Sequence, residues 1–332
     1  MRVFLALHIA ILLLWGGNLK IATYNVENLF DLQKSGYEYS EYIPYGKSLW
    51  NDHAYKTKLK NIAQVIKDID ADIIALEEIE SLQALKDLRF ELKRNGLYYQ
   101  YFKIADAKNT TVKVAILSKI PFIYTKEIVV GYSYAFRNIL EAKFRIGGED
   151  LYIFVNHWKS KGGHESMRVA CAKALKKRVL ELGEQNIIAL GDFNSHYEEY
   201  ITFKRKRKLN DTEGITGINH ILGTINYQQK LHKPLHVTTG EFYNLWYDAK
   251  SEDRFSYIYR GKKEVLDNIL VSAKLVDSKG LDYTEDSIHS FKAPYLFRGK
   301  KIYHWQMRWG KVRKHKNKGY SDHLPVLAKF QY

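Results

Sequence analysis

The chain has 332 residues, of which 45% are hydrophobic and 27% charged, and this composition excludes a disordered or fibrous protein. Lys and Arg total 52 against 37 Asp and Glu, so the formal net charge is +15. A positive field attracts polyanions such as nucleic acid or an anionic lipid surface, although the same charge can serve solubility alone. The only cysteine, Cys171, rules out an internal disulfide and a cysteine-based zinc site.

The amino terminus has the layout of a secretory signal. A positive charge at Arg2 precedes an apolar run from Val3 to Trp15, and small residues follow it. The run is shorter than the roughly 20 residues needed to span a bilayer. Trp15 disfavours cleavage after Gly17, so an uncleaved membrane anchor and a buried first element of the fold stay open as alternatives. We expect residues 1–18 to be a signal peptide or anchor and the protein to be periplasmic, secreted or membrane-anchored.

Short apolar runs alternate with longer amphipathic stretches along the rest of the chain. Strands are predicted at residues 20–26, 72–76, 112–118, 122–130, 136–146, 150–156, 186–190, 254–259, 264–272 and 324–330. One helix is predicted from the spacing of Leu59, Ile62, Ala63, Ile66 and Ile69, and a second from Met167, Ala170, Cys171, Ala174, Leu175 and Leu182. No repeat or linker divides the chain, so we expect one layered α/β domain over residues 19–332.

Polar residues stand at the ends of several predicted strands. They are Asn25 with Glu27, Glu77 with Glu78, Asn156 with His157, Asp192 with Asn194, and Asp322 with His323, while Asp267 lies inside a strand. Each motif alone is weak, because such residues also cap elements and form turns. Strand ends converge on one rim of a sheet, so the whole set can assemble a single site.

The residue types in this set indicate metal-assisted hydrolysis. Carboxylate and amide oxygens suit hard cations such as Mg²⁺, Mn²⁺ or Ca²⁺. A histidine beside them can donate to a phosphate oxygen or take a proton from water. Because the set holds no nucleophilic Ser or Cys, direct attack of water on a phosphoester is the expected reaction.

In order and spacing these motifs resemble the endonuclease/exonuclease/phosphatase superfamily, which includes deoxyribonuclease I and the AP endonucleases. The resemblance runs from about Lys20 to Phe330. It implies a deoxyribonuclease-I-like fold, which is a four-layer α/β sandwich of two packed mixed β-sheets flanked by helices. We expect a monomer with no protein partner.

The resemblance also assigns roles to individual residues. As metal ligands it implies Asn25, Glu27, Glu78 and Asp322. As catalytic residues it implies His157, Asp192, Asn194, Asp267 and His323, and as substrate-binding residues Arg137, Asn156, Lys159 and Lys161. Glu77 stands where the family usually has glutamine. Either the Asp267–His323 pair or Asp192 would activate the water, and the sequence leaves both assignments open.

Three features favour a nucleic-acid substrate; DNA is the expected one, although the sequence does not separate DNA from RNA. The net charge supplies attraction to a phosphate backbone. Basic runs at residues 204–208 and 311–318 precede catalytic strands, and Tyr303, Trp305, Arg308 and Trp309 interleave aromatic with basic residues. Residues 156–161 also resemble a subgroup of exported bacterial nucleases. Two alternatives stay open: a phospholipid or inositol-phosphate phosphoesterase on the same scaffold, and a catalytically inactive binding protein.

Overall fold

The computed structural model describes residues 16–203, 207–226 and 236–332. Most of the predicted signal or anchor (residues 1–15) and three residues of the first basic run (204–206) therefore lie outside the described residues. In the part of the chain that is described, no helix combines the length and apolar character needed to cross a bilayer.

The first β-sheet has β1 at its centre. Its strands, in spatial order, are β13 (Asp282–Tyr283), β19 (Val326–Gln331), β1 (Asn18–Leu29), β2 (Ile73–Ile79), β4 (Lys113–Ser118) and β3 (Tyr101–Ile104), and β14 (His289–Ser290) also pairs with β19. β1 and β2 run parallel, and the other pairs are antiparallel. The carboxyl ends of β1 and β2 therefore lie at the same edge, beside the residues that precede β19.

The second sheet repeats this plan around β8. Its order is β5 (Tyr124–Ile128), β6 (Ile139–Ile146), β7 (Glu149–His157), β8 (Asn186–Asp192), β12 (Asp267–Val271) and β9 (Tyr243–Asn244), with only β7 and β8 parallel. The register places His157 opposite Asp192, and Asp192 opposite Asp267. Three residues predicted for the site are thus aligned across neighbouring strands.

Alternate residues of the central strands fill the layer between the sheets. In β2, Ile73 and Ala75 face the second sheet, whereas Ile74 and Leu76 face the helices. This alternation follows from the period of two residues in a strand. Because both faces are covered, these strands read as continuous apolar runs, which is why the sequence predicted them.

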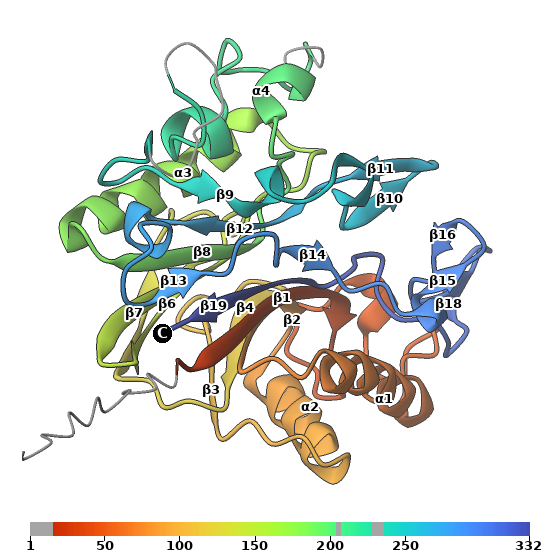
Figure 1. Cartoon of the computed structure of the whole chain (residues 1–332). Helices are drawn as coiled ribbons and strands as arrows, with labels where there is room; N and C mark the ends of the chain where they lie inside the picture. The colour runs from red at the N-terminus through yellow and green to blue at the C-terminus, as the bar shows by residue number, and fades with distance from the viewer. Residues whose placement is uncertain (1–15, 204–206, 227–235) are drawn as a thin grey trace, which may run out of the picture.

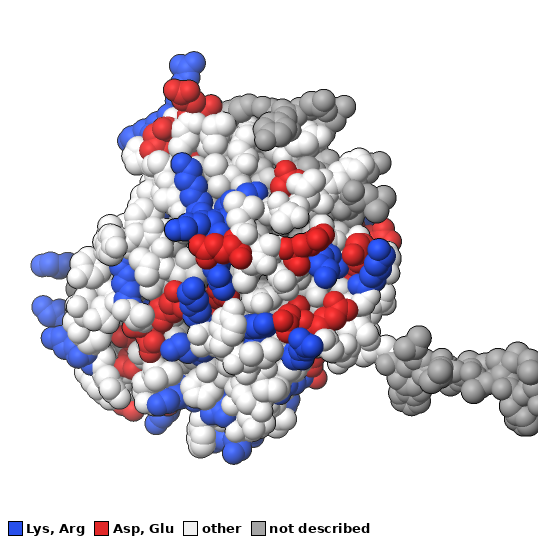
Figure 2. All heavy atoms as spheres, turned by 90° about the vertical axis from the view of Figure 1, so that its left-hand side faces the viewer, with Lys and Arg blue, Asp and Glu red and all other residues white. Residues whose placement is uncertain are grey.

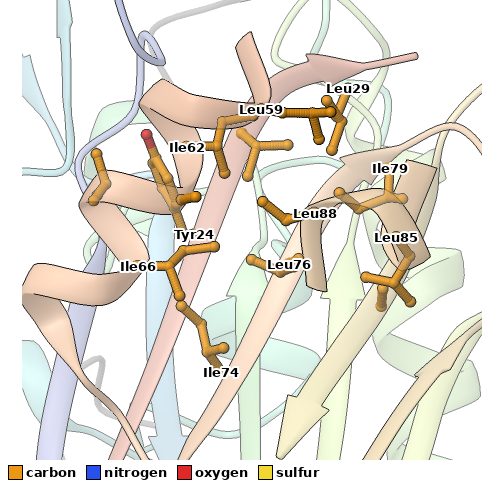
Figure 3. Close-up of a cluster of buried hydrophobic side chains, with 14 of the residues drawn as sticks. Tyr24, Leu29, Leu59, Ile62, Ile66, Ile74, Leu76, Ile79, Leu85 and Leu88 are labelled. Carbon is orange, nitrogen blue, oxygen red and sulfur yellow. The ribbon is translucent and has the colours of Figure 1, made fainter. Parts of the chain in front are cut away.

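Helices cover both outer faces (Figure 1). α1 (Asp52–Ile69) and α2 (Leu82–Arg94) pack on the first sheet, and Figure 3 shows Ile62, Leu88 and Leu76 meeting in that layer. Asn51 and Ser81 cap these helices by accepting backbone N–H bonds. On the second sheet lie α3 (Glu165–Leu182) and the short α4 (Glu199–Thr202). The predicted four-layer α/β sandwich is confirmed.

The buried face of α3 differs from the predicted one. Cys171 and Leu175 are buried as expected, but Met167 and Leu182 are only partly buried. Arg168 and Val179 lie in the buried face instead. The prediction failed at Arg168 because a charged residue was counted as surface, whereas this guanidinium is paired inside the protein.

Three two-stranded ribbons stand at the edge where β1 and β8 end, on the right of Figure 1. They are β10 (Tyr257–Tyr259) with β11 (Lys262–Glu264), β15 (Phe297–Arg298) with β16 (Lys301–Ile302), and β17 (Met307–Arg308) with β18 (Lys314–His315). Figure 2 views the molecule from the opposite side, where acidic and basic side chains are interspersed. Lys and Arg side chains therefore form no continuous basic surface on the face away from the ribbons.

Candidate active site

The predicted site residues meet at one end of the layer between the sheets. β1 and β2 bring Asn25 and Glu78 from the first sheet, and β7, β8 and β12 bring His157, Asp192 and Asp267 from the second. A cavity of about 650 Å³ opens there. It is lined by Tyr39, Glu78, Arg137, His157, Lys159, Ser160, Lys161, Gly162, Asp192, Asn194, Tyr257, Tyr259, Glu264, Leu266, Asp322 and His323.

Glu78 and Asp322 form the acidic side of the cavity. Burial raises the pKa of Glu78, and the charge of Asp322 raises it further. Burial and the charge of Glu27 raise the pKa of Asp322 to about 6. Glu78 has a φ of 67° at an irregularity in β2, a conformation that costs of order 1 kcal/mol or more and is typical of functional sites. Two carboxylates held in this way favour a bound cation that would relieve their repulsion.

The oxygen donors of Glu78 and Asp322 fit a divalent metal. Hard cations such as Mg²⁺ bind through one or two carboxylates plus substrate oxygens and water. Asn25 donates to Glu78 (3.3 Å) and to Asp192 (3.1 Å), so its amide connects the acidic side of the cavity to the second sheet. Asn25 thus connects the two acids through its amide nitrogen, and its role as a metal ligand through the amide oxygen stays a prediction.

Asp192, Asp267 and His323 form another group whose potential ligand atoms lie within 4.8 Å of one another. This group is a second candidate metal position beside Glu78 and Asp322. We favour Glu78 and Asp322, because Asp267 and His323 already satisfy each other through a 2.7 Å hydrogen bond.

The structure revises the role predicted for Glu27. One oxygen of its carboxylate accepts the backbone N–H of Trp305 (2.8 Å), and the other lies 3.3 Å from His304 Nδ1. The side chain thus holds the segment that leads into β17, and Glu27 is not among the residues that line the cavity. Its charge still acts on the site by raising the pKa of Asp322.

Asp192 lies at the centre of the site. Its Oδ1 accepts the backbone N–H of Asn194 (2.8 Å), and its Oδ2 accepts from Asn25. The preceding Gly191 has a φ of +130°, and an added Cβ would lie 2.0 Å from the Asn156 carbonyl oxygen, so only glycine fits there. Burial raises the pKa of Asp192 to about 7, which suits a group that exchanges protons near neutral pH.

His157 lies against both acids. Its Nε2 is 3.6 Å from Asp192 Oδ2 and 3.8 Å from Glu78 Oε1, and among the described residues its buried Nδ1 has no hydrogen-bond partner. Burial lowers the pKa of His157 well below its ordinary value, and the charge of Arg137 lowers it further. A neutral imidazole at this position can donate one hydrogen bond to a phosphate oxygen.

Asp267 and His323 form a buried pair. The carboxylate accepts from His323 Nδ1 at 2.7 Å, which leaves Nε2 for the cavity. Burial alone would lower the pKa of His323, but the neighbouring Asp267, Asp322 and Asp192 together raise it well above its ordinary value. The His323 ring therefore holds a proton in the absence of a cation.

The predicted substrate residues divide into three that line the cavity and one that does not. Arg137 and Lys159 line it, and Lys161 does so while paired with Glu199 at 3.0 Å. Asn156 is fully buried, and its amide bonds Phe154 and Trp158. Its role is to orient Trp158, not to contact substrate as predicted. Neighbouring residues of β7 point to opposite faces, so this orientation follows from the inward-facing Val155 and His157.

The sequence prediction missed the aromatic walls of the cavity. Tyr257 lies beside His323, with ring centroids 4.9 Å apart, and Tyr259 follows on the same ribbon. Tyr39 lines the cavity from the loop after β1. The sequence predicted a strand at residues 254–259, but nothing in it placed this strand beside His323.

Lys58 of α1 was also missed. It is buried beneath the acids and donates to the Tyr320 carbonyl oxygen at 3.0 Å. Burial lowers the pKa of Lys58 to about 8, while Glu27 and Asp322 oppose this shift. The apolar pattern of α1 did not indicate that the charged side chain of Lys58 would lie near the site.

The two-sheet sandwich and its charged cavity define a divalent-metal-dependent phosphoesterase. The sequence profile of the Endonuclease/Exonuclease/phosphatase family matches residues 20–331, and the chain belongs to this family. Its members are phosphoesterases and nucleases that depend on a divalent metal. A search of curated proteins found no match.

Solved structures show the same fold at low sequence identity. Humanized TDP2 from D. rerio is 14% identical with a TM-score of 0.57, covering 94% of this chain and 98% of that one. Truncated Caenorhabditis elegans TDP2 is 17% identical with a TM-score of 0.56, covering 95% and 98%. A family protein from Bacteroides thetaiotaomicron is 15% identical with a TM-score of 0.54, covering 96% of each chain. Another similar structure is D. rerio TDP2 complexed with a single-strand DNA product, with 15% identity and a TM-score of 0.56.

Proposed function

We propose that this protein is a DNA endonuclease that hydrolyses phosphodiester bonds by direct attack of water. The observation that carries the proposal is one cavity lined by both acidic and basic side chains. Glu78 and Asp322 supply oxygen ligands, and Arg137 and Lys159 face the same space. This arrangement suits a bound cation and a phosphate backbone together.

The side chains of the second sheet carry the proton chemistry. Asp192, with its pKa near 7, takes a proton from the attacking water. His323 keeps its proton through Asp267 and stabilises negative charge that develops on the phosphate. Neutral His157 and Asn194 add hydrogen bonds to the phosphate oxygens. When bound, Mg²⁺, Mn²⁺ or Ca²⁺ polarises the phosphate and stabilises the leaving oxygen.

DNA as substrate is supported by two observations. Arg137, Lys159 and Lys161 all line the cavity. The structurally similar D. rerio TDP2 is solved with a single-strand DNA product. A backbone-binding site of this kind requires no base contacts, which suits a nuclease of low sequence specificity.

Nicking of supercoiled plasmid tests the proposal. The wild-type protein is expected to nick with Mg²⁺, Mn²⁺ or Ca²⁺ and to lose this activity in EDTA. Glu78→Gln should abolish nicking while the far-ultraviolet circular dichroism stays unchanged, and Glu184→Gln, an exposed position outside the cavity, is the control. If wild type cleaves phospholipid or inositol phosphate and leaves plasmid intact with every metal, the alternative phosphoesterase function is correct.

We further propose that the protein is exported and acts as a monomer outside the cytoplasm. The signal-like sequence of residues 1–18 supports export. Cell fractionation of the native host tests it, with the periplasmic, secreted and membrane fractions as the expected locations. Intact protein in the cytosolic fraction would contradict it.

A further inference from the structure

Three exposed apolar side chains, Ile43, Trp309 and Val312, line one surface hollow, and Tyr45 and Leu49 are exposed in the same loop as Ile43. Trp309 is 78% exposed, Tyr45 66% and Leu49 45%, and Ile43 and Val312 are exposed beside them. A surface hollow of about 530 Å³ joins the 40–48 loop to residues 309–313. We call Ile43, Tyr45, Leu49, Trp309 and Val312 the apolar patch.

The fold displays this patch at a cost. Tyr45 has a φ of 56° and Leu49 a φ of 64°, in a turn closed by hydrogen bonds from Tyr45 N to Trp50 O and from Leu49 N to Gly46 O. The left-handed region costs a non-glycine residue about 1–2 kcal/mol. The turn is tied to the core through the carbonyl of buried Trp50, and it leaves the side chains of Tyr45 and Leu49 exposed.

A rigid base supports the patch. Trp50 and Trp305 are buried beneath it, and Trp305 Nε1 lies 2.8 Å from His315 Nδ1. His315 Nε2 in turn lies 2.8 Å from the Glu41 carbonyl oxygen, and the His315 N–H donates to Ser48 O. The 40–50 loop and β18 are thereby fixed to each other, so the patch is preformed.

The patch has a basic border. Lys47, Lys311 and Arg313 line the hollow, and the Arg313 guanidinium lies 4.2 Å from the Trp309 ring centroid. Glu41 is the acidic residue in this lining, and it pairs with Arg313 at 3.6 Å. Trp and Tyr favour the interface between water and lipid, and Lys and Arg extend beside them to headgroup phosphates. Ile43, Leu49 and Val312 add aliphatic surface, which a nucleic acid does not require.

We propose that the apolar patch binds the surface of an anionic phospholipid membrane, with Trp309 inserted at the headgroup level. β18 lies on the same side of Figure 1 as the β10–β11 ribbon, whose Tyr257, Tyr259 and Glu264 line the cavity. Glu27, near the end of β1, accepts the backbone N–H of Trp305 just ahead of β17. A bound membrane would therefore lie beside the active site. This binding is separate from catalysis and independent of residues 1–18.

Co-sedimentation of the full chain with vesicles tests the proposal. Wild type is expected to bind phosphatidylcholine vesicles that contain phosphatidylserine and to bind weakly to phosphatidylcholine alone. Trp309→Ser should weaken binding about tenfold, because a large side chain no longer inserts. Lys47→Gln and Lys311→Gln should each weaken it roughly fivefold, and added salt should act in the same direction. Nicking in vesicle-free solution should be unchanged in Lys47→Gln.

Phe90→Ser is the matched control, because Phe90 is 62% exposed on α2, away from the patch. Quenching by brominated lipid should be strong in wild type and weaker in Trp309→Ser. Wild type and Trp309→Ser have the same amino terminus, so the difference in quenching between them comes from the patch. The proposal is overturned if Trp309→Ser binds vesicles as wild type does, if no vesicle binds, or if the patch variants lose affinity for single-stranded DNA instead.

Discussion

The proton balance between Asp192 and His323 determines the role of each residue. Burial raises the pKa of Asp192 to about 7, while the surrounding acids keep His323 protonated. We expect Asp192→Asn to lower kcat by about a hundredfold or more, because the amide cannot accept the proton of water. His323→Gln should lower kcat while the activity of the residual enzyme still rises with pH. Steady-state rates across the pH range measure this, and an unchanged kcat in Asp192→Asn would contradict the assignment.

Glu77 makes a separate prediction about stability. It is fully buried, its Oε1 accepts from Thr23, and Oε2 has no partner among the described residues. Burial and the charge of Asp267 raise its pKa well above the ordinary value. The folded state therefore holds this proton more tightly than the unfolded state does. Stability should fall as pH rises above the unfolded pKa, by up to about 1.4 kcal/mol per pH unit.

Glu77→Gln removes this titration and should unfold at higher urea concentration than wild type at neutral pH. The difference should shrink toward acidic pH, where wild type is protonated in both states. Urea unfolding in EDTA at acidic, neutral and mildly alkaline pH is the measurement, with the exposed Glu184→Gln as control. A pH-independent difference would show that Glu77 is ionised in the fold.

At the scale of elements, α3 holds the loop of residues 159–163, whose Lys159 and Lys161 line the cavity. We call this loop the lysine loop. Arg168 is fully buried; its Nε bonds Glu165 at 2.7 Å, and its Nη1 donates to the carbonyl oxygens of Lys159 (3.2 Å), Ser160 (3.0 Å) and Gly163 (3.4 Å). A lysine at this position keeps the charge but loses the planar fork. We expect Arg168→Lys to raise KM about fivefold to tenfold with a smaller change in kcat, because uniform substrate binding is weakened.

The matched control is Arg178→Lys, since Arg178 is also in α3 and pairs with buried Glu141, far from the lysine loop. A double-mutant cycle with Lys159→Met should show non-additive effects on KM. An equal rise in KM and an equal fall in melting temperature in both arginine variants would mean that Arg168 serves stability alone.

Strand prediction succeeded where both faces of an element are buried. β1, β2 and β8 read as apolar runs because one face meets the other sheet and the second meets helices. The ribbons β15 to β18 have strands of only two residues, and tertiary contacts hold them, so no local pattern predicted their partners. The buried face of α3 was wrong for the related reason that the Arg168–Glu165 pair depends on loops distant in sequence.

The same reasoning explains the site predictions. The motif residues His157, Asp192 and Asp267 meet because all three continue the face that lies between the sheets. Glu27 departs from its predicted role because β1 is irregular there: Glu27 has a φ of 52° and Asn28 a φ of 66°, which turns the carboxylate toward Trp305. Sequence motifs identify residue types at strand ends, but a local irregularity redirects a side chain.

At the scale of the whole molecule, a cation should stabilise the fold as well as the reaction. Burial raises the pKa of Glu78 and the charge of Asp322 raises it further, and a bound divalent ion would relieve this repulsion. A cation at a hundred times its Kd adds about 2.7 kcal/mol to the free energy of unfolding. Thermal unfolding with EDTA and with Mg²⁺ should show this increase in wild type.

The double variant Glu78→Gln with Asp322→Asn should lose the increase in melting temperature on adding Mg²⁺. A retained increase would place the cation at Asp192, Asp267 and His323, the other candidate position. Adding Asp267→Asn would then remove it.

The order of the site residues along the chain has a consequence for a protein still being synthesised. Asn25 comes first, while Asp322 and His323 follow every other residue of the site, just ahead of β19, the strand that pairs with β1. A nascent chain therefore holds six of the seven strands of the first sheet before it holds Asp322 and His323. Under the proposed mechanism such a chain lacks Asp322 and His323, so we expect it to be inactive until translation has passed His323.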